Sequence, residues 1–220
     1  MAKLNIRRNV LAENDRIAES LRGYFGKNKT FVINIIGSPG CGKTTLLEKT
    51  IEHFKDKYKI YTLVGDVQTE EDAIRLKNAG GDAKQIITGG ACHLDARMIE
   101  KEFESTLPED LDMLIIENVG NLVCPSSYDL GEDNKIVIVS VPEGEEKPLK
   151  YPSIFVRSGL FILSKIDYLS LGGFDKDKIL ANAKKVNPKI MELCLSSKTG
   201  EGMDGWFEWV EESIKNKKNS

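Results

Sequence analysis

The chain has 220 residues and a formal net charge of −3, with 31 basic and 34 acidic side chains intermixed along it. This length suffices for one α/β domain with a sizeable core, and the absence of a basic tract argues against nucleic acid as a partner. No apolar run reaches the length of a membrane span and the first residues lack an apolar signal core, so we expect no membrane association, a cytoplasmic location and thiols rather than disulfides at the four cysteines.

Strands and helices alternate in the predicted order, which favours an α/β fold with a mostly parallel sheet and helices on both faces. An amphipathic helix over residues 8–27 leads into the chain. Segment 142–152 contains three prolines and no periodicity, so we expect a long loop there. Strands are expected at 31–36, 59–64, 84–88, 112–117, 135–141, 159–163 and 190–195, and helices at 43–56, 69–79, 94–105, 175–186 and 203–216.

A glycine-rich run follows the first predicted strand directly and reads G-x-x-x-x-G-K-T. Glycines without Cβ let the backbone approach phosphate oxygens, and the loop amides and the next helix N-terminus supply donors. Lys43 is expected to neutralise the β- and γ-phosphates, and the Thr44 hydroxyl to ligate Mg²⁺. The motif therefore predicts a P-loop fold that binds a nucleoside triphosphate through Gly37, Gly40, Cys41, Gly42, Lys43, Thr44 and Thr45.

Two later segments select the base. Lys165 and Asp167 end an apolar strand in the [N/T/S]-K-x-D pattern of GTPases. The carboxylate can accept two hydrogen bonds from the guanine edge, a pair that adenine does not offer, while the lysine stem covers the purine. Ser164 stands where asparagine commonly ties this strand to the phosphate loop, so the sequence leaves that tether open. Guanine specificity is therefore assigned to Lys165, Asp167 and the S-A-K-like loop Ser196, Ser197 and Lys198.

Acidic residues at two strand ends suggest hydrolysis with Mg²⁺. Glu117 ends an apolar strand, and Gly120 follows where a γ-phosphate sensor would supply a backbone N–H. Asp66 ends another strand and is expected to ligate Mg²⁺ or orient water, with a helix N-cap as the alternative. Arg75 and Arg97 lie in helical stretches, so no cis arginine finger is expected and hydrolysis should be slow. Catalysis is assigned to Lys43, Asp66, Glu117 and Gly120, and the magnesium shell to Thr44, Asp66 and Glu117.

Cysteine and histidine recur in two loops that each follow a predicted strand. Cys92 and His93 are adjacent, and Cys124 lies four residues after Gly120. Loops that follow parallel strands gather at one sheet edge, so these two loops can meet. Thiolate and imidazole suit Zn²⁺ or Ni²⁺, yet no C-x-x-C motif is present and free cysteines are often small buried hydrophobes. The residues alone leave both a metal site and simple packing open.

Together these motifs resemble the HypB family, the nickel-incorporation GTPases of [NiFe]-hydrogenase maturation. The resemblance implies a metallochaperone that binds and delivers nickel with hydrogenase-maturation partner proteins, and it implies that Cys92, His93 and Cys124 ligate nickel or zinc. The family's C-x-x-C-G-C motif and histidine-rich tract do not occur in this sequence. The matching segments are G-S-P-G-C-G-K-T-T, G-D-V-Q-T, T-G-G-A-C-H-L-D-A, E-N-V-G-N-L-V-C-P, E-G-E-E-K-P-L-K-Y-P, S-K-I-D and S-S-K-T-G.

The number of metal ligands in one chain bears on whether the protein forms a dimer. Three ligands per chain fall short of the four of a closed Zn²⁺ site, so we expect a homodimer, promoted by GTP, with the metal between two subunits and Lys147 and Lys150 near the partner's nucleotide. Residues 1–28 are interpreted as a leading helix and 29–220 as the P-loop GTPase domain. Three alternatives remain: a urease-type nickel GTPase, which typically carries Cys-Pro-His; a GTP switch without metal; and a P-loop kinase, which has no need of an S-K-x-D pattern.

Overall fold

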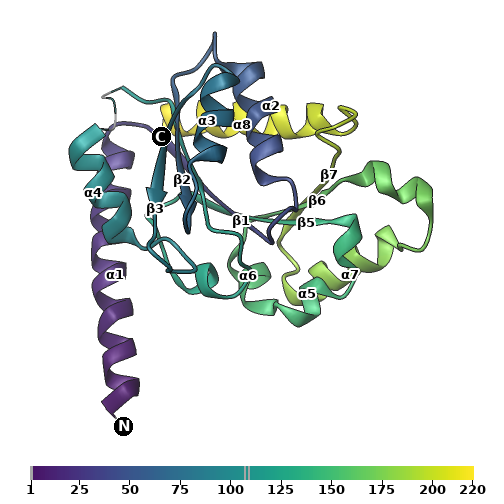
Figure 1. The fold of residues 1–220 in the computed structure, drawn as a ribbon, viewed down its shortest axis with the longest axis horizontal. Coiled ribbons are helices and arrows are strands. Elements are labelled where there is room, and N and C mark those ends of the chain that lie inside the picture. Colours follow the sequence, from purple (N-terminus) through teal and green to yellow (C-terminus); the bar gives the residue numbers. More distant parts are fainter. Residues whose placement is uncertain (1, 107, 109) are drawn as a thin grey trace.

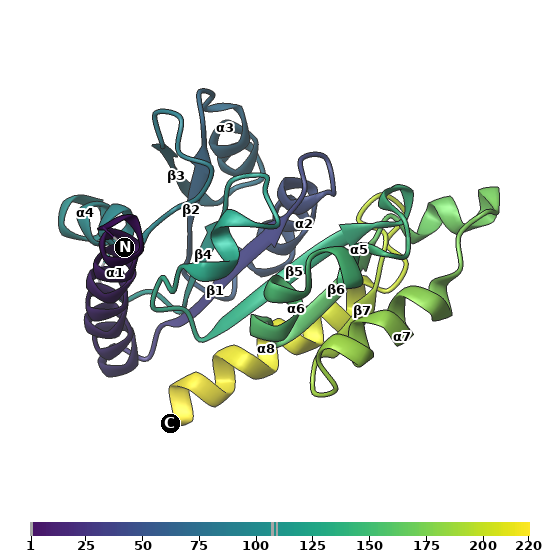
Figure 2. The same cartoon turned by 90° about the horizontal axis from the view of Figure 1, so that it is seen from below.

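The computed structural model describes residues 2–106, 108 and 110–220, and the side chains of 9–103, 108 and 110–220. Within these residues the chain forms a seven-stranded parallel sheet in the order β3-β2-β4-β1-β5-β6-β7. Figure 1 shows the fold, and Figure 2 labels each strand of the sheet. The strands are β1 (Phe31–Gly37), β2 (Ile60–Asp66), β3 (Asp82–Ile87), β4 (Met113–Glu117), β5 (Asn134–Ser140), β6 (Leu160–Ser164) and β7 (Met191–Cys194). The α-helices are α1 (Ala2–Lys27), α2 (Lys43–Phe54), α3 (Glu71–Asn78), α4 (Ala96–Thr106), α5 (Lys147–Lys150), α6 (Pro152–Arg157), α7 (Lys176–Val186) and α8 (Met203–Asn219).

Helices cover both faces of the sheet, as the sequence predicts. Strand β1 shows the reason, because its apolar residues point alternately to the two sides: Ile33 and Ile35 pack with α2, α3 and α8, whereas Val32 packs with α1 and α4. On that second face, further along the sheet, α6 and α7 cover β5 and β6. A strand buried on both faces needs a nearly continuous apolar run, and in β1 only Asn34 interrupts it.

The first helix joins the domain through its C-terminal half. Ile17, Leu21 and Phe25 are buried, and the ring of Phe103 on α4 meets Tyr24 at 4.3 Å between centroids. Helices α1 and α4 lie side by side at one end of the sheet (Figures 1 and 2). No helix among the described residues is both long and apolar enough to cross a membrane.

The proline-containing segment 142–152 is not a long loop, so that expectation is wrong. It forms the 3₁₀-helix η2 (Val141–Glu143), the single turn α5 and the start of α6. Pro142, Pro148 and Pro152 each occupy the first turn of a helix, where the missing N–H has no intrahelical partner to lose. The sequence also missed α6 and two other 3₁₀-helices, η1 (Cys124–Ser127) and η3 (Ile166–Leu171).

Candidate functional site

The phosphate loop connects β1 to α2 and depends on its glycines. Gly40 and Gly42 adopt φ angles of 74° and 100°, a region that side chains with Cβ rarely enter. A Cβ on Gly37 would lie 2.5 Å from the Cys41 sulfur and 2.7 Å from a backbone carbonyl oxygen. Lys43 is buried, and its Nζ has only 3.4 Å contacts to carbonyl oxygens of the loop. The ammonium group is thus held over the loop by weak contacts that a phosphate oxygen could replace.

Cys41 packs inside this loop. It is 1% exposed, and burial raises the pKa of its thiol to about 11. A thiol with so high a pKa remains protonated and unreactive at neutral pH. The structure therefore supports packing as the role of its side chain.

A cavity of about 460 Å³ opens beside the loop, at the carboxyl ends of β1, β2 and β4. Ligands in open parallel sheets bind at this edge. The lining brings together most of the residues that the sequence assigned to phosphate and magnesium: Gly40, Gly42, Lys43, Thr44, Thr45, Asp66, Glu117 and Gly120. Gly37 and Cys41 do not line it. The roles of the lining residues as ligands remain predictions, but their common location is a property of the fold.

Among the acidic residues that line this cavity, Glu117 has the largest shift in pKa. It is 3% exposed, and Oε1 accepts a hydrogen bond of 2.8 Å from the Thr44 hydroxyl, while Oε2 has no hydrogen-bond partner. Burial raises the pKa of Glu117 to about 7, against the opposing charge of Lys43. A buried carboxylate with an unpartnered oxygen beside a hydroxyl suits Mg²⁺, which commonly takes one or two carboxylates plus substrate phosphates. These residues therefore fit the implied ion.

The raised pKa predicts a specific pH dependence of stability. Because the folded-state pKa of about 7 exceeds the unfolded value of 4.5, the folded protein binds more protons between these values, and its stability falls as pH rises through that window. In the absence of nucleotide and Mg²⁺, Glu117→Gln should therefore exceed wild type in unfolding free energy by on the order of 3 kcal/mol above pH 7. The difference should narrow towards pH 4.5 in urea titrations, and the exposed Glu212→Gln should follow wild type. A pH-independent difference would contradict the assignment.

Asp66 ends β2 and points into the loop that follows. Its Oδ1 accepts backbone hydrogen bonds from Gln68 at 2.8 Å and Thr69 at 3.0 Å. Burial alone would raise the pKa of Asp66, but these amides outweigh it and hold the value below its usual range. Helix α3 begins only at Glu71, without a side-chain cap, so the alternative of a helix N-cap is wrong. Asp66 instead stabilises a turn at the rim of the cavity as an ionised carboxylate.

Arg75 extends from α3 into this same cavity, which its position in a helical stretch did not reveal. Its guanidinium donates to both carboxylate oxygens of Glu48, at 2.9 and 2.7 Å, and to the Thr45 hydroxyl at 3.2 Å. Arg75 does lie in a helix, as predicted, and its side chain lines the phosphate cavity. Arg75 is engaged by Glu48 through two hydrogen bonds, and the absence of a cis arginine finger stays a prediction.

A second cavity, of about 310 Å³, adjoins the phosphate loop. Inside it, the Ser196 hydroxyl donates to Asp167 Oδ1 at 2.7 Å, and Lys165 adopts a left-handed backbone conformation with its Nζ 2.6 Å from the Gly40 carbonyl oxygen. All five base-side residues predicted from the sequence line this cavity, together with Tyr168, which the sequence reading missed: Lys165, Asp167, Ser196, Ser197 and Lys198.

Serine supplies the tether that asparagine commonly provides. The Ser164 hydroxyl donates to the Cys41 carbonyl oxygen at 2.6 Å, and both residues are buried. Strand β6 is thereby tied to the phosphate loop, which holds the base cavity beside the phosphate cavity.

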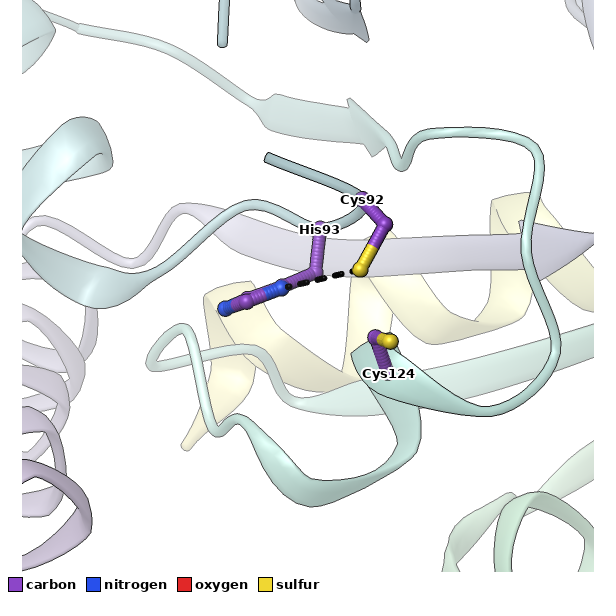
Figure 3. Close-up of side chains that lie close together, drawn as sticks. All are labelled: Cys92, His93 and Cys124. Carbon is purple, nitrogen blue, oxygen red and sulfur yellow. Dashed lines mark hydrogen bonds between the residues drawn. The ribbon is translucent and has the colours of Figure 1, made fainter. Parts of the chain in front are cut away.

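Cys92, His93 and Cys124 form the cluster in Figure 3. The first two lie in the loop before α4, and Cys124 begins η1, so two loops at one sheet edge meet as expected. Their ligand atoms lie within 4.8 Å of one another, and Cys92 Sγ is 3.8 Å from His93 Nδ1. A thiolate and an imidazole on one tetrahedral ion would be separated by about 3.6 Å, from metal–ligand distances near 2.3 and 2.0 Å. The cluster therefore needs little rearrangement to hold a metal.

The protonation states of Cys92 and His93 act in opposite directions on metal binding. A hydrogen bond with the Cys124 thiol raises the pKa of Cys92, and burial adds to that rise. Burial lowers the pKa of His93, against a smaller effect of Asp95, so its imidazole is neutral near pH 7. The Tyr128 ring stacks on His93 at 3.9 Å between centroids and limits its orientation. Metal loading must release a thiol proton, which links metal affinity to pH.

Comparisons with known proteins show the family of the chain. Residues 31–192 match the family model described as CobW/HypB/UreG, nucleotide-binding domain. Hydrogenase maturation factor HypB of Escherichia coli K12 is 46% identical over 208 residues, which cover 94% of this chain and 72% of that protein. The crystal structure of HypB from Helicobacter pylori in complex with nickel matches with a TM-score of 0.86 at 40% identity, over 93% and 96% of the two chains. HypB from Archaeoglobus fulgidus matches with a TM-score of 0.85 at 39% identity, over 92% and 99%.

Proposed function

The chain belongs to the CobW/HypB/UreG nucleotide-binding family, among the hydrogenase maturation factors HypB, and from this we propose that it is a GTP-hydrolysing metallochaperone that binds and delivers nickel during [NiFe]-hydrogenase maturation. The observation that carries the proposal is that two sites share one sheet edge. The phosphate cavity and the Cys92–His93–Cys124 cluster are joined by the short segment from Glu117 to Cys124. Nickel is the cargo in this proposal.

Polar groups of the two cavities have defined parts in the proposed reaction. Asp167 would accept the guanine edge, with its carboxylate oriented by Ser196, and Lys43 would neutralise the β- and γ-phosphates. Glu117 and Thr44 would hold Mg²⁺, which supplies charge neutralisation at the phosphate oxygens when bound. Asp66, kept ionised by backbone amides, would orient water or complete the magnesium shell, and the Gly120 amide would meet the γ-phosphate.

Intrinsic hydrolysis should be slow, because Arg75 is engaged by Glu48 and GTPases without a free arginine turn over slowly until a partner supplies charge. Asp66→Ala should abolish the remaining turnover in a phosphate-release assay while GTP stays bound. Unchanged turnover in this variant would limit Asp66 to stabilising its turn. A wild-type protein that hydrolyses many GTP molecules per second would contradict the slow-rate prediction.

The metal cluster supports a site shared between two subunits. One chain contributes three ligand atoms, whereas a closed Zn²⁺ site takes four, and a two-fold axis presents the same groups twice. Cys124 lies just downstream of Gly120, so a γ-phosphate that draws in Gly120 would also move the thiol. GTP would thereby favour the dimer and the assembled site, and hydrolysis would release nickel.

Metal analysis combined with sedimentation tests this function. Wild type should bind Ni²⁺ and Zn²⁺ at a higher stoichiometry, and sediment as a dimer, with a non-hydrolysable GTP analogue rather than with GDP. Cys124→Ala should lose the metal but retain GTP binding, while Cys194→Ala, outside the cluster, should match wild type. A wild-type protein that binds GTP but no metal would favour the GTP-switch alternative. A monomer that holds metal equally in both nucleotide states would refute the coupling.

A further inference from the structure

One buried side chain bridges the nucleotide cavity and the metal cluster. Asn118 directly follows Glu117, lines the phosphate cavity and is 1% exposed. Its Oδ1 accepts backbone hydrogen bonds from Leu94 at 3.2 Å and from Val119 at 3.0 Å. Leu94 is the neighbour of His93, and Val119 is the neighbour of Gly120. A single amide oxygen therefore holds the backbone beside a metal ligand and the backbone beside the γ-phosphate sensor.

The amide nitrogen of Asn118 extends the connection across the sheet. It donates to Asn34 Oδ1 on β1 at 3.1 Å, and Asn34 Nδ2 donates to Glu132 Oε1 at 3.2 Å. Asn34 is 0% exposed, so these bonds are shielded from water.

Glu132 continues the network to the other side of the metal cluster. It forms a buried ion pair with Lys135 at 3.2 Å, and Lys135 Nζ donates to the Tyr128 carbonyl oxygen at 2.8 Å. The Tyr128 ring is the one that stacks on His93. The network thus reaches His93 from two directions: through the backbone at Leu94 and through the ring of Tyr128.

Burial makes these connections difficult to break. An amide that loses a partner away from water is left unsatisfied, which disfavours the broken state. A shift of Val119 and Gly120 towards a γ-phosphate must either draw Leu94 along through Asn118 or leave a buried polar group without its partner. The first outcome moves His93 with its neighbour Leu94, and the second is disfavoured by the unpaired buried group, so the nucleotide and the metal bias the same element.

We propose that Asn118 is a positioning residue that couples the nucleotide state to the metal site through Leu94 and Asn34. The inference rests on the proposed function, since it assumes that this chain binds GTP and a metal cargo. It adds a route that does not pass along the chain from Gly120 to Cys124.

Metal affinity measured in two nucleotide states tests the coupling. Ni²⁺ is titrated into the full-length protein saturated with GDP or with a non-hydrolysable GTP analogue, and the ratio of the two dissociation constants is the readout. In Asn118→Ala this ratio should lie closer to one than in wild type, by a factor of at least about three. That factor corresponds to a decrease of about 0.7 kcal/mol in the coupling free energy. Asn182→Ala is the matched control, because Asn182 is a buried amide on α7 that bonds the Glu145 carbonyl oxygen, outside both sites.

A wild-type ratio in Asn118→Ala, or an equal loss in Asn182→Ala, would overturn the inference while leaving the proposed function intact. If the two Ni²⁺ dissociation constants of the wild-type protein were equal, there would be no nucleotide–metal coupling. That result would overturn both the inference and the coupling part of the proposed function. Absence of Ni²⁺ binding by wild type would refute the proposed function directly.

Hydrogen exchange can be measured on the wild-type protein, so this second test of the coupling remains possible even if Asn118→Ala does not fold. Replacing GDP by the GTP analogue should change the exchange rate of the Leu94 amide, whose acceptor is Asn118, and the Asn182 control should keep that change. An unchanged Leu94 rate would overturn the inference. Asn118→Asp, which keeps the oxygen acceptor but loses the donor to Asn34, should retain the Leu94 response and lose part of the affinity ratio.

Discussion

Lys43→Ala is expected to lower GTP affinity by at least about 100-fold and to reduce turnover to background, the largest effect of any single substitution in the cavity. Lys43 is buried at the start of α2, with its ammonium over the phosphate loop and only long contacts to carbonyl oxygens. Its removal leaves the phosphate charge without this neutralising group. Loss of the same cation would also raise the pKa of Glu117 further, because Lys43 opposes the effect of burial there.

Fluorescent-nucleotide titration and phosphate release measure the two effects of Lys43→Ala separately. Lys49→Ala is the matched control, because Lys49 is an exposed lysine on the same helix that pairs with Glu52. This control should bind and hydrolyse GTP as wild type does. GTP affinity within a factor of about three of wild type in Lys43→Ala would exclude Lys43 as a phosphate ligand, since a charge-assisted contact contributes more than that.

Asp167→Asn should shift nucleotide preference from guanine to xanthine. The carboxylate can accept both N–H donors of the guanine edge, whereas an amide turns one acceptor into a donor. The expected loss of GTP affinity is about 2–4 kcal/mol, or roughly 30- to 1000-fold. Xanthine presents a carbonyl in place of the guanine amine, so XTP affinity should rise. The Ser196 hydroxyl that donates to Asp167 Oδ1 can still find an acceptor in the variant.

Competition binding among GTP, XTP and ATP measures this shift in nucleotide preference. Asp177→Asn, an exposed carboxylate on α7 outside the base cavity, should leave the preference unchanged. Equal affinity of wild type for ATP and GTP would refute guanine recognition altogether. Retained GTP preference in Asp167→Asn would place recognition on the backbone of the Ser196–Lys198 loop instead.

Much of the fold and of the nucleotide site could be predicted because their signals are local. The phosphate loop occupies a few consecutive residues between an apolar strand and a helix, and glycines at fixed spacing are required by the backbone path itself. Glu117 and Lys165 could be assigned because each directly follows or ends an apolar run, and parallel strands all carry their ligand residues at one edge. The metal ligands were named by resemblance, since adjacency of Cys92 and His93 carries little information alone.

The tertiary structure decided the features that depend on contacts between distant segments. Local pattern cannot specify that the Ser164 hydroxyl reaches the phosphate loop or that Arg75 enters the cavity from α3. The prolines of 142–152 read as loop signals because sequence pattern does not distinguish a proline that breaks a helix from one that begins it.

Asn118 illustrates the same limit most clearly. The sequence pattern around Asn118 predicts no role for it, because asparagine is common in turns and at strand ends. Only the packing of β1, β4 and the loop before α4 gives it partners at Asn34, Leu94 and Val119. Short motifs specified the residue types of the nucleotide site, and the metal ligands were assigned by resemblance. The proximity of the two sites, and the buried polar groups that join them, were decided by the stacking of parallel strands, because burial and hydrogen-bond partners arise only from the packed sheet.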